Sequence, residues 1–77
     1  MNVKILKCLV DLAYPNLGKS HSATISDPEE FFKQFPRNEA IMKELYRLSP
    51  IYISLLETAD TLAIGVNKPA FEYFNLL

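Results

Sequence analysis

Apolar residues near the start of the chain recur at helical spacing. Between Met1 and Tyr14, one face of a helix would collect Ile5, Leu6, Leu9, Leu12 and Ala13, and the opposite face Lys4, Lys7 and Asp11. Asn2 can cap such a helix, and Pro15 ends it. The alternation of Val3 and Ile5 with polar residues leaves a β-strand from Asn2 to Val10 as the competing interpretation. The longer pattern favours a helix.

Two further segments carry the start and stop signals of helices. In Ser26 to Phe35, Asp27 and Pro28 mark the start, and the following Pro36 stops the helix. In Asn38 to Leu48, Asn38 can act as the cap. The inner face of this second helix is predicted to hold Ile41, Met42, Leu45, Tyr46 and Leu48, and its exposed face Glu39, Lys43, Glu44 and Arg47. The polar residues 16–25, with Gly18 and His21, are expected to form a surface loop.

The densest apolar stretch runs from Ser49 to Leu77. Ser49 and Pro50 can start a helix whose apolar face would hold Tyr52, Leu55, Leu56, Ala59, Leu62, Ala63 and Val66. Gly65 can take the left-handed conformation that ends a helix, and Asn67 can cap a second helix with Pro69 in its first turn. The buried side of that second helix would hold Ala70, Phe71, Phe74 and Leu77.

Taken together, these patterns predict an all-α fold. Residues 1–77 are expected to form a single domain, because a chain of 77 residues is too short for two. The expected architecture is a small bundle of about four to five short helices, with a corner of helix, tight turn and helix at the C-terminal end.

Residues 58–77 resemble the helix-turn-helix of phage Cro and C1-type repressors and related antitoxins. The matching residues are Ile64, Gly65 and Val66 at the turn, the run Asn67 to Phe71, and Phe74 further on. The resemblance implies that the second helix enters the major groove of DNA as part of a dimer. The residues that would contact DNA are Asn67, Lys68 and Tyr73.

The same stretch departs from that pattern in sequence and in charge. Thr61 stands where the family usually has alanine, and Asp60 where it often has an apolar residue. From Leu48 to Leu77 the only cation is Lys68, against the three anions Glu57, Asp60 and Glu72. Affinity for DNA comes mainly from lysine and arginine that neutralise phosphates. DNA binding is therefore the alternative hypothesis rather than the first, and nucleic acid is not the expected partner.

The composition of the chain excludes several classes of function. The formal net charge of −1 gives no long-range attraction to nucleic acid or acidic membranes, and no apolar run approaches the roughly eighteen residues of a membrane span. Cys8 is the only cysteine, so an internal disulfide is impossible and a cytoplasmic protein is expected. One cysteine and one histidine supply no zinc-ligand set, so no metal and no cofactor are predicted.

Side chains suited to catalysis do not converge in the sequence. The carboxylates lie at helix starts and on exposed helical faces, where capping and solubility account for them. Gly18, Lys19 and Ser20 look like the end of a phosphate-binding loop, but Ala13 stands where the upstream glycine would be. His21 has no recognisable nucleophile or orienting acid. The chain is therefore expected not to be an enzyme.

The surplus of large apolar side chains suggests a binding function. Hydrophobic residues make up 49% of the chain, and four tyrosines and five phenylalanines exceed what so small an interior can hide. We therefore expect a small non-enzymatic regulator that binds another protein, of the inhibitor, antirepressor or adaptor type, and a phage origin is compatible with its size. Self-association into a homo-oligomer is a further expectation. The candidate contact residues are the aromatic side chains Phe31, Phe32, Tyr46, Tyr52, Tyr73 and Phe74.

Overall fold

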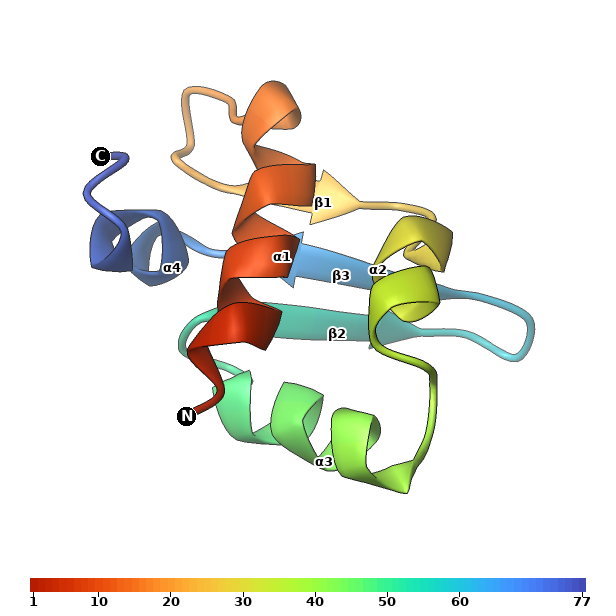
Figure 1. Cartoon of the computed structure of the whole chain (residues 1–77). Helices are drawn as coiled ribbons and strands as arrows, with labels where there is room; N and C mark the ends of the chain where they lie inside the picture. Colours follow the sequence, from red (N-terminus) through yellow and green to blue (C-terminus); the bar gives the residue numbers. More distant parts are fainter.

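The computed structural model describes all residues 1–77 and shows an α+β domain. In chain order the elements are α1 (Val3–Ala13), a short 3₁₀ turn η1 (Tyr14–Asn16), β1 (Ala23–Ile25), α2 (Glu29–Gln34), α3 (Glu39–Leu48), β2 (Ile53–Glu57), β3 (Leu62–Val66) and α4 (Lys68–Tyr73). Figure 1 shows α1 and α2 in front of the three strands, with α3 below them and α4 to the left. The prediction of an all-α bundle is therefore wrong.

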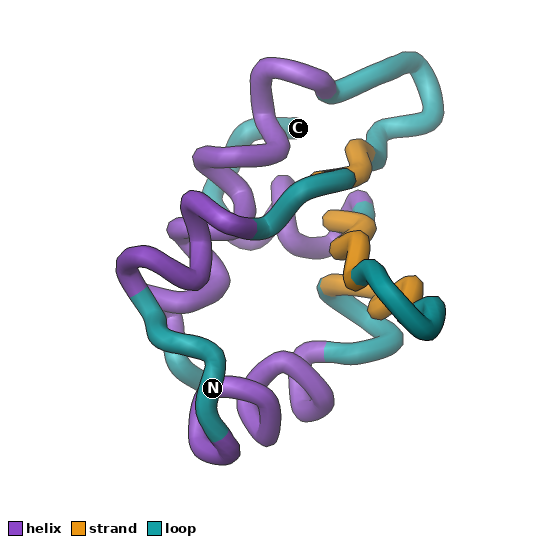
Figure 2. The backbone as a smooth tube through the Cα atoms, turned by 90° about the vertical axis from the view of Figure 1, so that its right-hand side faces the viewer, coloured by secondary structure: helices purple, strands orange, loops and turns teal.

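The three strands form one antiparallel sheet in the order β1-β3-β2. Strand β3 is central, with Gly65 opposite Thr24 of β1 on one side and opposite Ser54 of β2 on the other. Viewed along the sheet, as in Figure 2, all four helices lie to one side of the strands, so the fold has two layers. The opposite face of the sheet is not covered by any helix.

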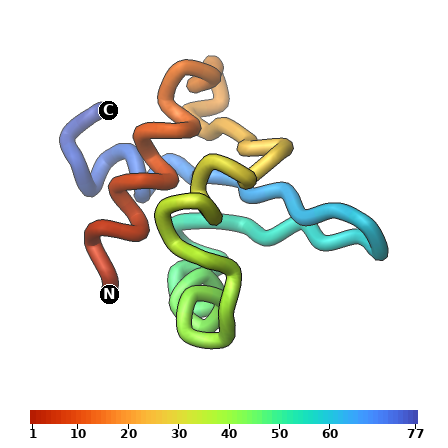
Figure 3. The backbone as a smooth tube through the Cα atoms, turned by 45° about the vertical axis from the view of Figure 1, so that its right-hand side comes forward, coloured from red at the N-terminus to blue at the C-terminus, as the bar shows by residue number.

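The predicted helix that starts at Ser49 and Pro50 and ends at Gly65 is instead the β2–β3 hairpin. Alternate residues Leu62, Ile64 and Val66 of β3 are buried, which is the two-residue period of a strand with one face on the core. Thr58 and Thr61 close the turn: the Thr58 N–H donates to the Thr61 carbonyl oxygen at 2.9 Å, and their hydroxyl oxygens are 2.6 Å apart. In Figure 3 this turn reaches out beyond the helices.

The helix-turn-helix corner is accordingly absent as a fold element. Gly65 lies within β3 and does not have a positive φ, so it makes no turn between helices. The only helix of the expected pair is α4, which is shorter than predicted and buries Ala70 and Phe71. Residues 16–25, expected to be a loop throughout, also contain strand β1.

The helices predicted in the first half of the chain are confirmed. The Asn2 side chain caps α1 by accepting from the Ile5 N–H at 3.1 Å, and Asn38 caps α3 by accepting from the Ile41 N–H at 3.0 Å. Within α3, however, two side chains exchange the expected roles. Tyr46, expected inside, is 56% exposed, and Glu44, expected outside, is only 7% exposed.

One hydrophobic core holds the two layers together. It lies between the helices and the covered face of the sheet, and no buried side-chain nitrogen or oxygen lacks a hydrogen-bond partner. Its largest fully buried side chains are Phe31, Phe71, Ile5, Leu6, Leu9, Leu45, Leu48, Ile53 and Ile64, with Val10 and Val66. Helix α1 supplies five buried residues and contacts α2, α4 and the sheet, whereas α3 packs against β2.

Candidate binding surface

The side chains with reactive chemistry lie apart from one another. His21 is exposed on the loop before β1, where its φ is 61°, and the hydroxyl oxygens of Ser20 and Ser22 are 3.1 Å apart beside it. No group of three or more histidine, cysteine or acidic side chains is placed to hold a metal ion. Burial, followed by the neighbouring Asp11 carboxylate, raises the pKa of the Cys8 thiol, so this thiol stays protonated at neutral pH.

Phe31 and Phe32 occupy different environments although they are adjacent. Phe31 is fully buried, with its ring 5.4 Å from that of Phe35 and 5.1 Å from that of Phe32. It is a core residue and presents nothing to a partner. Phe32 is half-buried, and the Arg37 guanidinium lies 5.5 Å from its ring centroid. This contact covers part of the ring.

Tyr46 is exposed on α3 and stands apart from the other aromatic residues. Its hydroxyl donates to Oε1 of Glu57 at 3.0 Å, which ties α3 to the end of β2. This hydrogen bond and the charge of the Glu57 carboxylate raise the pKa of the Tyr46 hydroxyl. Tyr46 is therefore an exposed side chain with a local partner.

The other three candidate residues form one group, which we call the aromatic cluster: Tyr52, Tyr73 and Phe74. The ring of Tyr73 lies edge-on to both others, 6.2 Å from Tyr52 and 5.0 Å from Phe74. Tyr73 is 45% exposed, and the other two are half-buried. The fold thus brings Tyr52, directly before β2, beside residues about twenty positions further along the chain at the end of α4.

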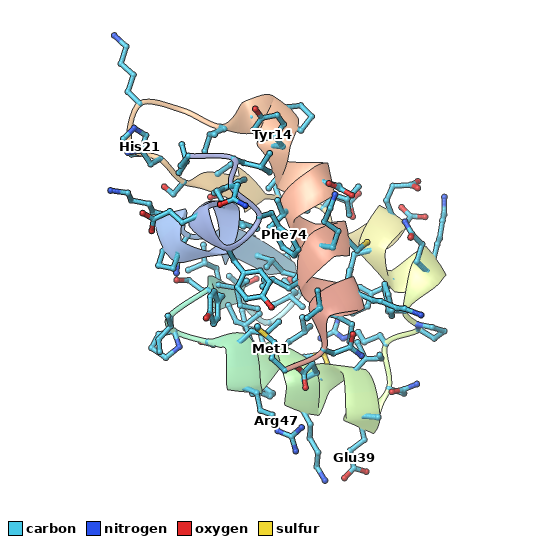
Figure 4. All side chains as sticks on the ribbon, turned by 60° about the vertical axis from the view of Figure 1, so that its left-hand side comes forward. Met1, Tyr14, His21, Glu39, Arg47 and Phe74 are labelled. Carbon is cyan, nitrogen blue, oxygen red and sulfur yellow. The ribbon has the colours of Figure 1, made fainter.

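The cluster continues onto the outer surface of α1. The ammonium group of Lys7 lies 5.7 Å from the centroid of the Phe74 ring. Beyond this contact is an open hollow of about 430 Å³, which lies over α1 between Phe74 and the end of α2. Its lining residues are Val3, Lys4, Lys7, Cys8, Asp11, Gln34, Phe35 and Phe74. Figure 4 shows Phe74 beside α1, on the same side of the molecule as Met1.

Val3 and Phe35 also line this hollow, although neither was expected at a binding surface. Val3 is 42% exposed, because it lies away from the buried face of α1. That position was a visible signal: an apolar residue among Lys4 and Lys7 on the polar side of an amphipathic helix. Phe35 gives no such signal, since it follows Phe31 at helical spacing and packs partly against the same core.

The three residues expected to contact DNA lie in different environments. The half-buried Asn67 side chain bonds to the chain around the start of β2, where Nδ2 donates to the Pro50 carbonyl oxygen at 3.0 Å and to Ser54 Oγ at 3.2 Å. Lys68 is exposed at the start of α4, and Tyr73 belongs to the aromatic cluster. Only one of the three is thus a free polar side chain.

Comparisons of the chain with protein-family models, with curated proteins and with solved structures found no match. None of the helices is both long enough and apolar enough to cross a bilayer.

Proposed function

We propose that this protein is a small non-enzymatic regulator that acts by binding another protein, as an inhibitor, antirepressor or adaptor does. The observation that supports the proposal is the aromatic cluster and its continuation into the hollow on α1. Partly exposed tyrosine and phenylalanine side chains gathered from distant parts of a chain are typical of the anchors that dominate interface energetics. A cytoplasmic location is part of the proposal and rests on Cys8 being the single cysteine, without a disulfide partner in the chain.

The proposal is tested by affinity capture with matched variants. Tagged wild-type protein, Tyr73→Ala and Tyr46→Ala are each exposed to lysate of the source cell, with and without nuclease. Tyr46 is the control, because it is exposed to a similar extent but lies outside the aromatic cluster. We expect wild type and Tyr46→Ala to retain one stoichiometric protein that survives nuclease treatment, and Tyr73→Ala to lose it. Melting temperatures measured in parallel establish that all three remain folded.

DNA binding through Asn67, Lys68 and Tyr73 is the competing hypothesis, and the same capture tests it. Nucleic acid recovered without nuclease and lost with it would favour this hypothesis. Direct titration with duplex DNA would then show an affinity that falls steeply as salt rises. Retention of the same protein by wild type and by Tyr73→Ala would instead contradict the part we assign to the aromatic cluster.

A further inference from the structure

The hollow on α1 combines an apolar lining with an excess of positive charge. Its apolar lining consists of Val3, Cys8, Phe35 and Phe74. Its charged side chains are Lys4 and Lys7 against the single carboxylate of Asp11, in a chain whose formal net charge is −1. The hollow is therefore more basic than the protein as a whole.

Lys4 forms no ion pair within the chain. Lys7 is paired with Asp11, with 2.6 Å between Nζ and Oδ1, whereas no carboxylate lies within 4.0 Å of the Lys4 ammonium. Lys4 also lies in the first turn of α1, where the helix dipole disfavours a cation. Helices α2 and α3 have glutamates in their first turns. The Lys4 ammonium is therefore free to pair with an anion bound from outside.

The lining also limits the conformation of whatever binds there. It is built from α1, from the last residue of α2 and its C-cap Phe35, and from Phe74 at the end of α4. No strand edge borders the hollow, so an extended segment would find no row of backbone N–H and C=O groups with which to pair. A helix satisfies its own backbone hydrogen bonds and needs only side-chain contacts.

We infer that the hollow binds an acidic amphipathic helix of the partner protein. The inference rests on the proposed function and names the chemistry of the partner. Apolar side chains on one face of that helix pack against Val3, Phe35 and Phe74, and carboxylates beside them pair with Lys4 and Lys7. Because these lysines lie at the rim in water, charge selects among helices while apolar contact supplies most of the affinity.

Three synthetic helical peptides test the inference. They share one apolar face and carry glutamate, glutamine or lysine on the polar face, and each is titrated into ¹⁵N-labelled full-length protein followed by NMR. We expect the glutamate peptide to shift the signals of Val3, Lys4, Cys8 and Phe74 and to bind roughly tenfold more tightly than the glutamine peptide. The lysine peptide should bind most weakly.

Two charge-reversal variants test whether Lys4 is responsible for the preference for the glutamate peptide. Lys4→Glu should remove the preference for the glutamate peptide, whereas Lys68→Glu, the matched exposed lysine outside the hollow, should retain it. Equal binding of the glutamate and lysine peptides, shifts confined to other residues, or no binding at all would overturn the inference. Shifts of the same signals on concentrating the protein alone would also overturn it, since a second copy would then fill the hollow.

Different experimental results would contradict the inference and the proposed function. If no peptide binds but Tyr73→Ala still loses the captured protein, the chain binds a protein through the aromatic cluster and only the acidic helix is wrong. If capture fails as well, both are wrong.

Discussion

The backbone N–H of Asn2 donates a hydrogen bond of 2.8 Å to Oε2 of Glu44, a side chain 42 positions further along the chain. Glu44 is the only charged residue buried in the protein, and its other oxygen lies 3.4 Å from the Arg47 guanidinium. The carboxylate therefore lies at the start of α1, where the helix dipole favours a negative charge. Together with the Asn2 cap on the Ile5 N–H, this bond fixes the first turn of α1 against α3.

Replacement of Glu44 should destabilise the fold. Glu44→Ala leaves the partly buried Asn2 N–H without its acceptor, so we expect the free energy of unfolding to fall by about 1–3 kcal/mol, measured by urea denaturation. Arg47→Ala is the matched control. It removes the other partner of Glu44, but the Arg47 side chain is 75% exposed, so a loss below about 1 kcal/mol is expected. Equal losses would mean that the ion pair, and not the bond to Asn2, is the important contact.

A substitution at Gly65 tests whether this residue lies in a strand, as observed, or in a turn between two helices, as the sequence predicted. In β3 its φ is not positive, and a Cβ atom added there would lie 3.6 Å from the Ser54 Cβ, an ordinary contact. Gly65→Ala should therefore leave the free energy of unfolding unchanged or raise it by up to about 1 kcal/mol, because alanine loses less backbone entropy on folding. Thermal unfolding measures the change. A clear loss of stability would be the result expected for a left-handed glycine at a turn, and would contradict the strand.

The sequence was sufficient to predict α1 and α3 because cap and period agree there, whereas the prolines Pro28 and Pro36 on either side indicated α2. Asn2 and Asn38 precede runs whose apolar residues recur at three and four positions, and no other element explains both signals. The β2–β3 hairpin was not predicted because short apolar runs fit both the helical period and the two-residue period of a strand. Ala59 completed the helical pattern yet is exposed in the turn, whereas Leu62, Ile64 and Val66 already alternated at the period of a strand.

Which aromatic residues are exposed could not be predicted from local sequence. Phe31 and Phe32 are adjacent on α2, and the packing of that helix against α1 and the core buries Phe31 and leaves Phe32 partly exposed. The meeting of Tyr52 with Tyr73 depends equally on the hairpin, since β2 and β3 bring the start of one strand beside the helix that follows the other. Aromatic composition alone could not identify which of these side chains meet, because that depends on tertiary structure.

The Cys8 thiol should make stability fall at alkaline pH. Its pKa in the folded protein is raised above the ordinary value of 9.0, first by burial and then by the charge of Asp11. The unfolded chain therefore loses this proton at lower pH than the folded chain. The free energy of unfolding should decrease as pH rises through 9 and towards the raised value, and Cys8→Ser should remove this component.

Alkylation of Cys8 provides the direct measurement. The rate of its reaction with iodoacetamide follows the thiolate fraction, so its midpoint in folded protein should lie above 9.0, the ordinary value that the urea-unfolded chain should approach. A midpoint below that of the unfolded chain would show that an electropositive neighbour such as Lys4 or Lys7 outweighs burial and Asp11.

Asn67 should prove to be a structural residue of the β3–α4 junction. Its Nδ2 donates to the carbonyl oxygens of Pro50 and Ile51 at 3.0 and 3.4 Å and to Ser54 Oγ at 3.2 Å, so one amide ties the end of β3 to the turn before β2. Asn67→Ala removes these donors, and we expect the free energy of unfolding to fall by about 1–2 kcal/mol in urea denaturation.

Asn67→Asp is the sharper variant, because it keeps the size of the side chain but replaces its N–H donors with acceptor oxygens. A carboxylate would face the Pro50 and Ile51 carbonyl oxygens, so the loss should be at least as large as for alanine. Lys68→Ala, one residue on and exposed without an ion pair, should change stability by less than about 0.5 kcal/mol. If instead both Asn67 variants keep full stability but weaken binding to DNA, Asn67 faces a ligand rather than Pro50, and DNA binding through α4 gains support.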